Sequence, residues 1–390
     1  MRIAMVFDGL GYGGIERVGI DYCKLMINLG HEVDVYNLIP ESNAMEGELP
    51  PKCQVIYYKF TNMMAPETYS YGVKKWWWGK YAYPVVFIVM SFALMIRKFI
   101  NPIRHSKYDI AIAFSGHMND LTFISCNFIF SLKKLCWLHG ALYGYLLSSP
   151  GYLLLYQKIK NLVVLVDEAQ EHVYQYNRFL NLNITKMYNP TFISERNINK
   201  SNVEMLHKKY GKFLIMVDRF ANTHKDHYTI INGVKILKEK YGRDYKLLLV
   251  GDGEEMSRVK QFCVENLIQD NVVFVGSTLD VQDYYAASYI LVHASVAGEG
   301  LPTVILEAMA FGKPVVVSDS KVGPREIIKN DEYGLLFGIR NSEEMAKKVE
   351  SLYADENLYS YYSKQGYKRL EDFKPDVISK QLSSMFDKLV

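Results

Sequence analysis

Short runs of β-branched and aromatic residues alternate along the chain with longer stretches of helical periodicity. This alternation is typical of βαβ units, in which parallel strands form a sheet and helices cover its faces. The first half contains a series of predicted strands: Ile3–Phe7, Glu32–Asn37, Gln54–Tyr58, Ile110–Phe114, Lys134–Trp137 and Leu162–Val166. The second half contains another: Phe213–Val217, Lys246–Val250, Val272–Val275, Ile290–His293, Pro314–Val317 and Leu335–Phe337. The pattern predicts an α/β protein with two doubly wound, Rossmann-like domains.

The boundary between the two series falls near Met187–Thr191, which contains the turn dipeptide Asn189-Pro190. The residue before a proline is kept out of the helical region, and a polar stretch of linker composition, Ser194–Ser201, follows. We therefore expect domains at residues 1–189 and 190–374. A last helix over residues 375–390 is expected to begin at Pro375, because proline suits the first helical position.

One segment of the first half, residues 68–108, is unusual for such a domain. It contains Trp76–Trp78, then a 12-residue apolar run, Val85–Ile96, and then Arg97–Lys98. This run is shorter than the roughly 20 residues that span a bilayer, so a spanning helix is not expected. Tryptophans and basic residues that flank an apolar stretch suit the headgroup level of a membrane. We favour contact with the membrane surface over the alternative, a buried core helix with a solvated basic end.

Charge is distributed unevenly between the two halves. The chain holds 45 Lys and Arg against 42 Asp and Glu, and this net charge of +3 does not by itself suggest nucleic acid. Residues 1–189 hold 18 basic and 14 acidic side chains, whereas residues 190–390 hold 27 and 28. No acidic residue lies between Thr68 and Tyr108. The excess positive charge therefore coincides with the apolar segment and favours an anionic membrane surface as a partner.

The cysteines are scattered and form no C-x-x-C pair: they are Cys23, Cys53, Cys126, Cys136 and Cys263. This spacing argues against a disulfide framework or a zinc site and favours a reducing compartment. The N-terminus continues directly into a predicted strand, without the pattern of a signal peptide. We expect a cytoplasmic protein that is peripheral at the inner face of the cell membrane.

A glycine-rich loop, Asp8–Glu16, lies between the first predicted strand and a helix. Glycines such as Gly13 and Gly14 let backbone amides approach a phosphate at a helix N-terminus. A dinucleotide site would also need an acidic residue at the end of the second strand, but that strand ends in Asn37. We therefore interpret the loop as facing a substrate; a tight structural turn and a dinucleotide site are the alternatives.

The strongest pattern is the block Gly298–Ala310, which follows the strand ending at His293 and opens a helix. Glu299 and Glu307 have seven residues between them. The amides of Gly300–Thr303 would lie at the helix start, where the helix dipole favours an anion. Carboxylates bind sugar hydroxyls while amides and cations bind phosphates, so the block suits a sugar nucleotide. For Glu307 alone, a helix-surface carboxylate is the alternative.

A third pattern, Val217–Asp226, also follows a predicted strand. Arg219 and Lys225 lie in it and are candidates to neutralise a pyrophosphate, Arg as a planar fork and Lys as a point charge. Each residue taken singly is equally consistent with a solvated loop.

Together these motifs resemble the family 4 glycosyltransferases, retaining enzymes of the GT-B fold. Glu299–Glu307 matches the E-x7-E motif of that family, and Glu299–Val304 is similar to members that build bacterial surface polysaccharides such as O-antigen and capsule. Arg219 and Lys225 match the basic pair of the family, and Gly13–Glu16 resembles its N-terminal G-G-x-E loop.

Further parts of the chain extend the resemblance over its whole length. Gly251–Glu254 and Val275–Ser277 resemble the turns that border the nucleotide base. His139 falls where the family has a cleft histidine that contacts the donor sugar, although a histidine after a strand is more often a structural hydrogen-bonding group. The resemblance implies two facing Rossmann-like domains with a cleft between them, and a last helix that crosses back onto the first domain.

The resemblance also assigns site residues. The implied catalytic residues are Arg219, Lys225, Glu299 and His139. The implied donor-binding residues are Gly13, Gly14, Gly253, Gly276, Gly300, Leu301, Pro302, Thr303 and Glu307. The candidate membrane or acceptor contacts in the segment 68–108 are Lys74, Lys75, Trp76, Trp77, Trp78, Lys80, Arg97 and Lys98.

The implied reaction transfers a hexose or N-acetylhexosamine from a nucleotide sugar, most simply a UDP-sugar, to a lipid-linked oligosaccharide with retention of configuration. Arg219, Lys225 and the loop amides would stabilise the departing diphosphate, whose own oxygen takes the acceptor proton. No metal or other cofactor is expected, and no D-x-D pair occurs in the sequence.

Two alternatives belong to other classes. A sugar-nucleotide epimerase of the GT-B fold would convert its substrate without an acceptor, but the E-x7-E block in this form argues against it. A non-catalytic subunit of a glycosyltransferase complex would be expected to have lost part of the site.

Overall fold

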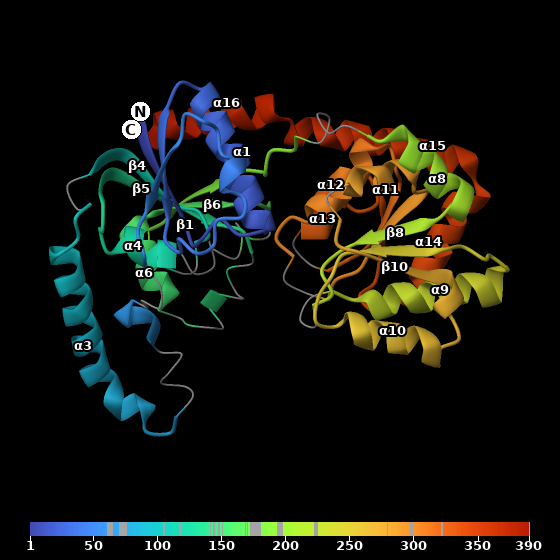
Figure 1. Ribbon diagram of the computed structural model, residues 1–390, viewed down its shortest axis with the longest axis horizontal. Coiled ribbons are helices and arrows are strands. Elements are labelled where there is room, and N and C mark those ends of the chain that lie inside the picture. The colour runs from blue at the N-terminus through green and yellow to red at the C-terminus, as the bar shows by residue number, and fades with distance from the viewer. Residues whose placement is uncertain are drawn as a thin grey trace. The chain divides into compact units, whose positions relative to one another are not determined.

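The computed structural model describes residues 1–390 except 61–64, 70–75, 104–105, 117–118, 141, 143–144, 147–148, 150, 168, 170, 172–180, 193–197, 222–224, 279, 297–298, 321–322 and 390. The chain divides into two compact units, each built around its own parallel sheet. The N-terminal unit comprises Met1–Pro190 together with Pro375–Val390, and the C-terminal unit comprises Thr191–Lys374. Both sheets have helices against their faces (Figure 1), so the α/β architecture predicted from the sequence is confirmed.

The N-terminal sheet has seven strands in the order β3-β2-β1-β4-β5-β6-β7. They are β1 (Arg2–Phe7), β2 (Glu32–Asn37), β3 (Gln54–Tyr57), β4 (Lys107–Ala113), β5 (Phe130–Leu138), β6 (Asn161–Val164) and β7 (Asn183–Lys186). Strand order reverses beside β1, and ligands of such sheets bind at the carboxyl ends of the strands near that reversal. The edge strand β7 was not predicted, because it is short, polar and largely solvent-accessible.

The helices of this unit are α1 (Gly14–Asn28), α3 (Gly79–Phe99), α4 (Asn119–Ser125), α6 (Tyr152–Ile159) and α16 (Pro375–Leu389), with 3-10 turns η1 (Glu46–Glu48) and η2 (Pro66–Tyr69). The last helix, α16, begins at Pro375 and belongs to this unit although it comes from the far end of the chain. The rings of His31 and Phe386 meet at a centroid distance of 5.7 Å, where α16 contacts the end of α1.

Helix α3 lies to one side of the N-terminal sheet (Figure 1) and is largely uncovered. Of its 21 residues, only Gly79 and Leu94 are buried, so the alternative of a core helix is wrong. The helix is longer than the apolar run Val85–Ile96 because it includes polar and aromatic residues at both ends. By length and composition alone it could cross a membrane, which the length of the apolar run did not predict.

The C-terminal sheet has six strands in the order β10-β9-β8-β11-β12-β13. They are β8 (Leu214–Val217), β9 (Leu247–Val250), β10 (Val272–Gly276), β11 (Ile290–His293), β12 (Val315–Ser318) and β13 (Leu335–Phe337). Each coincides with a predicted strand to within one residue at either end. The reversal here lies between β8 and β11, whose following loops carry the Arg219 and Glu299 motifs.

The helices of the C-terminal unit cover both faces of this sheet. They are α8 (Lys200–Tyr210), α9 (His227–Tyr241), α10 (Met256–Glu265), α11 (Val281–Ala287), α12 (Thr303–Ala310), α13 (Gly323–Ile328), α14 (Ser342–Ala354) and α15 (Glu356–Leu370), with 3-10 turns η5 (Gln269–Asn271) and η6 (Glu371–Phe373). Ile230 and Val234 of α9 pack with Val349 of α14 in one buried apolar cluster with the strands.

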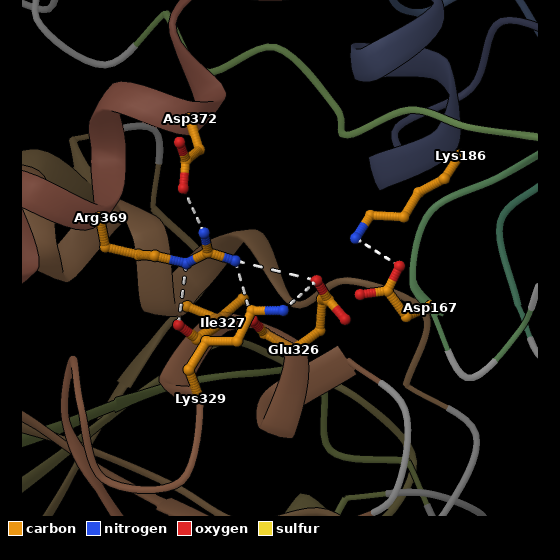
Figure 2. Close-up of polar contacts among 7 residues, drawn as sticks. All are labelled: Asp167, Lys186, Glu326, Ile327, Lys329, Arg369 and Asp372. Atoms are coloured by element: carbon orange, nitrogen blue, oxygen red, sulfur yellow. Dashed lines mark hydrogen bonds and ion pairs between the residues drawn. The ribbon is translucent and has the colours of Figure 1, made fainter.

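A buried arginine ties α15 to α13 (Figure 2). Arg369 is only 3% exposed; its Nε donates to the carbonyl oxygen of Ile327 at 3.0 Å, and its Nη2 donates to that of Glu326 at 2.8 Å. These carbonyls lie in the last turn of α13 and have no partner within the helix. Arg369 also pairs with Asp372, and Lys329 pairs with Glu326 at 2.8 Å. The position of α13 is therefore set by charge-assisted hydrogen bonds.

Candidate functional site

The loops that follow β8 and β11 meet at the carboxyl edge of the C-terminal sheet. Lys225 and Ser295 form an isolated antiparallel bridge, and the amide of Asp226 donates to the carbonyl of Ala294 at 2.9 Å. The side chain of Asp226 then caps α9 by accepting from the Thr229 amide at 3.1 Å. This pairing brings Lys225 next to Glu299, which is 74 positions away in the sequence.

Four buried ionisable side chains form one cluster there, which we call the charge cluster: Asp218, Lys225, His293 and Glu299. Lys225 Nζ lies 2.6 Å from Asp218 Oδ1 and pairs also with Glu299. His293, fully buried at the end of β11, has Nδ1 3.1 Å from Asp218 Oδ2 and Nε2 3.9 Å from Glu299 Oε1. The structure thus brings together the predicted residues Lys225 and Glu299.

The charge cluster shifts the pKa values of Asp218 and Lys225. Burial by itself would raise the pKa of Asp218, but the neighbouring His293 and Lys225 outweigh it and hold that pKa below its ordinary value. Burial likewise opposes the charge on Lys225, but the two carboxylates outweigh it and raise its pKa. Lys225 is therefore a fixed cation that orients two carboxylates.

Asp218 and His293 were not predicted as site residues. Both stand at the carboxyl end of a parallel strand, one at each side of the point where strand order reverses. Their position at strand ends was readable from the sequence, but their contact with each other depends on strand order, which the sequence pattern does not give.

Arg219 follows Asp218 and is exposed. It forms no ion pair with any residue in the described ranges, in contrast to Lys225. It is therefore a cation available to an anionic ligand at this edge of the sheet.

The predicted donor loop leads into α12. Leu301 is buried, the carbonyl of Glu299 accepts from the Gly323 amide at 3.2 Å, and α12 begins at Thr303 after Pro302. No side chain caps this helix start, where first-turn amides have no acceptor within the helix. Gly300 precedes it in the same loop. Glu307 is partly buried within α12 and accepts a hydrogen bond from the Tyr285 hydroxyl at 3.0 Å.

The predicted glycine turns are packed against the loop that carries Arg219. A Cβ atom on Gly253 would lie 2.3 Å from the carbonyl oxygen of Phe220, so this position requires glycine. The carbonyl of Gly276, the last residue of β10, accepts from the Gly251 amide at 2.9 Å. The three loops after β8, β9 and β10 therefore support one another.

In the N-terminal unit, Gly13 has an extended backbone and Gly14 opens α1, with free space where a Cβ of Gly14 would lie. His139 follows β5, and its Nε2 lies 2.8 Å from the carbonyl oxygen of Phe114. Its ring also meets the Phe114 ring at 4.7 Å. His139 thus makes the structural hydrogen bond that was its alternative interpretation, at the carboxyl edge of the sheet.

A carboxylate pair at the same edge was missed. Asp8 accepts hydrogen bonds from the amides of Asn119 and Asp120, both at 2.9 Å, and Asp120 accepts from Ser115 and Gly116 at 2.7 and 2.9 Å. Burial and the charge of Asp120 raise the pKa of Asp8 to about 8, against the opposing effect of the two amides.

The candidate membrane residues adopt different arrangements. Lys74 and Lys75 lie outside the described residues. Trp76 and Trp78 stack with centroids 5.2 Å apart, Trp77 is 85% exposed, and Lys80, the second residue of α3, is exposed. Arg97 turns toward the protein, where it bonds to the Lys59 carbonyl and lies over the Phe60 ring. Lys98 is exposed.

Within the described part of the chain, no group of three or more His, Cys, Asp or Glu side chains is placed to hold a metal ion. In the charge cluster, the carboxylates surround the ammonium group of Lys225.

Comparison with known proteins places these observations in a family. Residues 197–369 match the family model of glycosyl transferases group 1. An uncharacterized glycosyltransferase of Haemophilus influenzae is 26% identical over 93% of this chain and 92% of its own length. A Campylobacter jejuni N-acetylgalactosamine-N,N'-diacetylbacillosaminyl-diphospho-undecaprenol 4-alpha-N-acetylgalactosaminyltransferase is 28% identical over 46% of this chain and 48% of its own. Other curated relatives match over about half of their own length or less.

Among solved structures, Anabaena Alr3699/HepE in complex with UDP and glucose superposes with a TM-score of 0.74 over the full length of both chains, at 18% identity. This similarity shows the fold, which is that of GT-B glycosyltransferases. The match of residues 197–369 to the glycosyl transferases group 1 model confirms the predicted resemblance for this part of the chain.

Proposed function

We propose that this protein is a retaining, metal-independent glycosyltransferase of surface polysaccharide synthesis. It transfers a hexose or N-acetylhexosamine from a UDP-sugar to a lipid-linked oligosaccharide at the inner face of the cell membrane. The observation that carries the proposal is the charge cluster, with Lys225 held between Asp218 and Glu299 and with Arg219 exposed beside it.

This arrangement suits a sugar nucleotide because it separates two kinds of group. Arg219 and the uncapped start of α12 supply positive charge and amide donors for a diphosphate. Glu299, oriented by Lys225, supplies acceptors for sugar hydroxyls. A backbone carbonyl of the same loop is already bonded to Gly323, so the loop is braced before the ligand arrives.

The proposed reaction balances without another cofactor. The acceptor hydroxyl oxygen bonds to the anomeric carbon on the face that the nucleotide leaves, while the bond from that carbon to the diphosphate oxygen breaks. The acceptor proton passes to the departing diphosphate. Arg219 stabilises the charge that develops on this leaving group, and stabilisation of this kind contributes about 3–4 kcal/mol per donor group in other enzymes.

The lipid-linked acceptor is supported by α3 and by the name of the Campylobacter relative, which includes a diphospho-undecaprenol. The outer face of α3 carries exposed apolar side chains: Val85, Ile88, Val89, Phe92, Met95, Ile96 and Phe99. We favour a helix that lies in the membrane surface over one that spans it. Leu94 is buried against the unit and Arg97 bonds to the Lys59 carbonyl, and a spanning helix would have to give up both contacts.

The reaction is tested by incubating the purified protein with a panel of UDP-, GDP- and dTDP-sugars, with and without a lipid-linked oligosaccharide acceptor. We expect UDP to be released only when the acceptor is present, and EDTA not to affect this release. By NMR, the anomeric configuration of the transferred sugar, axial or equatorial, should match that of the donor. Conversion of the sugar nucleotide without an acceptor would instead identify an epimerase. Lack of turnover with every donor, together with lack of UDP binding, would support a non-catalytic subunit.

The membrane contact is tested separately with vesicles. Ile88→Ser/Phe92→Ser should weaken co-sedimentation with vesicles at least tenfold, because each exposed apolar side chain contributes about 1.5–3 kcal/mol when it is buried. Val264→Ser, a similar change at an exposed position of the C-terminal unit, serves as the control. Equal binding of both variants and the unaltered protein would refute membrane contact by α3.

A further inference from the structure

A cavity of about 580 Å³ lies under the C-terminal half of α3. Ser91, Leu94 and Lys98 of α3 form one wall, and residues of the sheet and of neighbouring helices form the others, among them Lys134 and Lys158. The floor is provided by the N-terminal unit alone, so the cavity does not depend on the C-terminal unit.

The cavity is positively charged. Lys98, Lys134 and Lys158 come from α3, β5 and α6, and the acidic residue in the wall, Glu67, is already paired with Lys158. Lys134 forms no ion pair with a residue in the described part of the chain. Burial lowers the pKa of Lys134, and the charges of Lys98 and Lys158 lower it further. Three lysines therefore share the wall with one carboxylate, and the excess positive charge favours an anion.

An apolar groove continues from the cavity. A neighbouring hollow of about 670 Å³ shares Met95, Lys98 and Asn127 with it, and the apolar residues Phe99, Ile129 and Phe130 together with Ser131 complete its lining. Phe99 is 74% exposed and Phe130 is 51% exposed. A free inorganic phosphate would leave this groove empty, whereas a phospholipid has both an anionic headgroup and apolar chains.

The cavity lies far from the reaction. Lys134 is at the middle of β5, whereas His139 follows its carboxyl end, five residues later. At about 3.3 Å per residue, the two positions are separated by roughly 16 Å along the strand. The glycine loop after β1 lies at the carboxyl edge as well, so the cavity is not where the diphosphate of an acceptor would meet the donor.

We propose that Lys98, Lys134 and Lys158 form a lysine pocket that binds the phosphate of an anionic phospholipid headgroup, with the adjoining groove covering the start of its acyl chains. This inference rests on the proposed membrane contact of α3, but it is independent of the identity of donor and acceptor. The pocket would make membrane binding selective for anionic lipid, while α3 supplies the apolar contact.

The test compares two double variants of equal charge change on the same edge of the sheet. Lys98→Gln/Lys134→Gln removes two positive charges from the pocket and leaves the Lys158–Glu67 pair intact. Lys107→Gln/Lys133→Gln removes two exposed lysines outside it. Co-sedimentation is measured with phosphatidylcholine vesicles that contain or lack phosphatidylglycerol. Circular dichroism and thermal unfolding check that both variants fold.

We expect the unaltered protein to prefer vesicles with phosphatidylglycerol, and the pocket variant to lose about 10- to 30-fold of that preference, since a lysine near an anionic surface contributes roughly a factor of five. The control variant should lose much less. Equal losses in both variants would show a diffuse electrostatic attraction and overturn the pocket. Competition by inorganic phosphate as effective as by phosphatidylglycerol vesicles would overturn the lipid as ligand.

The outcomes also separate this inference from the proposed function. If the pocket variant matches the unaltered protein while Ile88→Ser/Phe92→Ser releases it from all vesicles, the pocket is refuted and the membrane contact of α3 stands. If no variant changes vesicle binding, the membrane contact is refuted too.

Discussion

The two units have sheets of similar construction but keep carboxylates at their carboxyl edges in different ways. In the N-terminal unit, Asp8 and Asp120 are held by backbone amides. In the C-terminal unit, Asp218 and Glu299 surround the side chain of Lys225. Backbone amides satisfy the first pair of carboxylates, whereas Lys225 satisfies the second pair and the neighbouring Arg219 forms no ion pair with a described residue. The difference indicates that the C-terminal edge is the one equipped to receive a charged ligand.

The largest expected effect concerns the independence of the two units. Arg369→Met should destabilise the C-terminal unit by about 3–5 kcal/mol, because it leaves the last carbonyls of α13 without donors and removes a buried charge from beside Glu326. Urea unfolding should then show the C-terminal unit unfolding first, in a separate transition. Arg325→Met, which breaks an exposed pair with Asp319, should cost less than about 1 kcal/mol. A single urea unfolding transition with an unchanged midpoint for Arg369→Met would contradict the stabilising role assigned to Arg369.

The next effect tests whether the C-terminal edge carries the chemistry. Arg219→Met should lower kcat for transfer by about 10²- to 10³-fold, because a cation that faces the departing diphosphate is lost. Steady-state UDP release measures it. Arg258→Met, at an exposed arginine of α10, is the matched control and should leave kcat unchanged. Full activity of Arg219→Met would show that the departing diphosphate does not bind at Arg219.

The two units should also respond to pH in opposite directions. Burial lowers the pKa of His227, which stacks on Phe220 at 4.2 Å, to about 4. As the pH falls below 6.5, the unfolded chain binds a proton at His227, whereas the folded unit does not bind it until about pH 4. The free energy of unfolding therefore decreases by up to about 1.4 kcal/mol for each unit by which the pH falls in this window. His227→Phe keeps the ring contact and should flatten this acid loss in thermal unfolding at pH 4.5–6.5. An unchanged slope would exclude His227 as its source.

The N-terminal unit should respond between about pH 4 and 8. Because the pKa of Asp8 is raised to about 8, the folded unit keeps a proton that the unfolded chain releases, and stability falls as the pH rises from about 4 to 8. Because one proton is involved, the loss is at most about 1.4 kcal/mol per pH unit. Asp8→Asn should reduce this slope, and the exposed Asp270→Asn should not. Equal slopes in both variants would contradict the raised pKa.

Much of the fold was predictable because both sheets are parallel and buried. Strands such as β1 and β11 are nearly continuous apolar runs, which stand out from the helices around them. The strand segments that were not predicted are those whose residues are less buried. Edge strand β7 is polar, and the start of β5 at Phe130 is exposed and was placed four residues late.

The site was predictable in part. The motifs with Arg219 and Glu299 were found because glycine, proline and charged residues follow directly on predicted strands. Their partners Asp218 and His293 were missed because an aspartate or histidine at a strand end has many ordinary roles. Only the neighbouring positions of β8 and β11 bring these two into contact with each other.

The sequence by itself determined the alternation of strands and helices, the turn between the units and the acid-free window around the apolar segment. Each of these depends on local composition and period. The tertiary structure decided which charges meet and which side of α3 stays uncovered. Those outcomes depend on strand order and on contacts such as Leu94 against the N-terminal unit, because burial and charge pairing arise between residues that are distant in the chain.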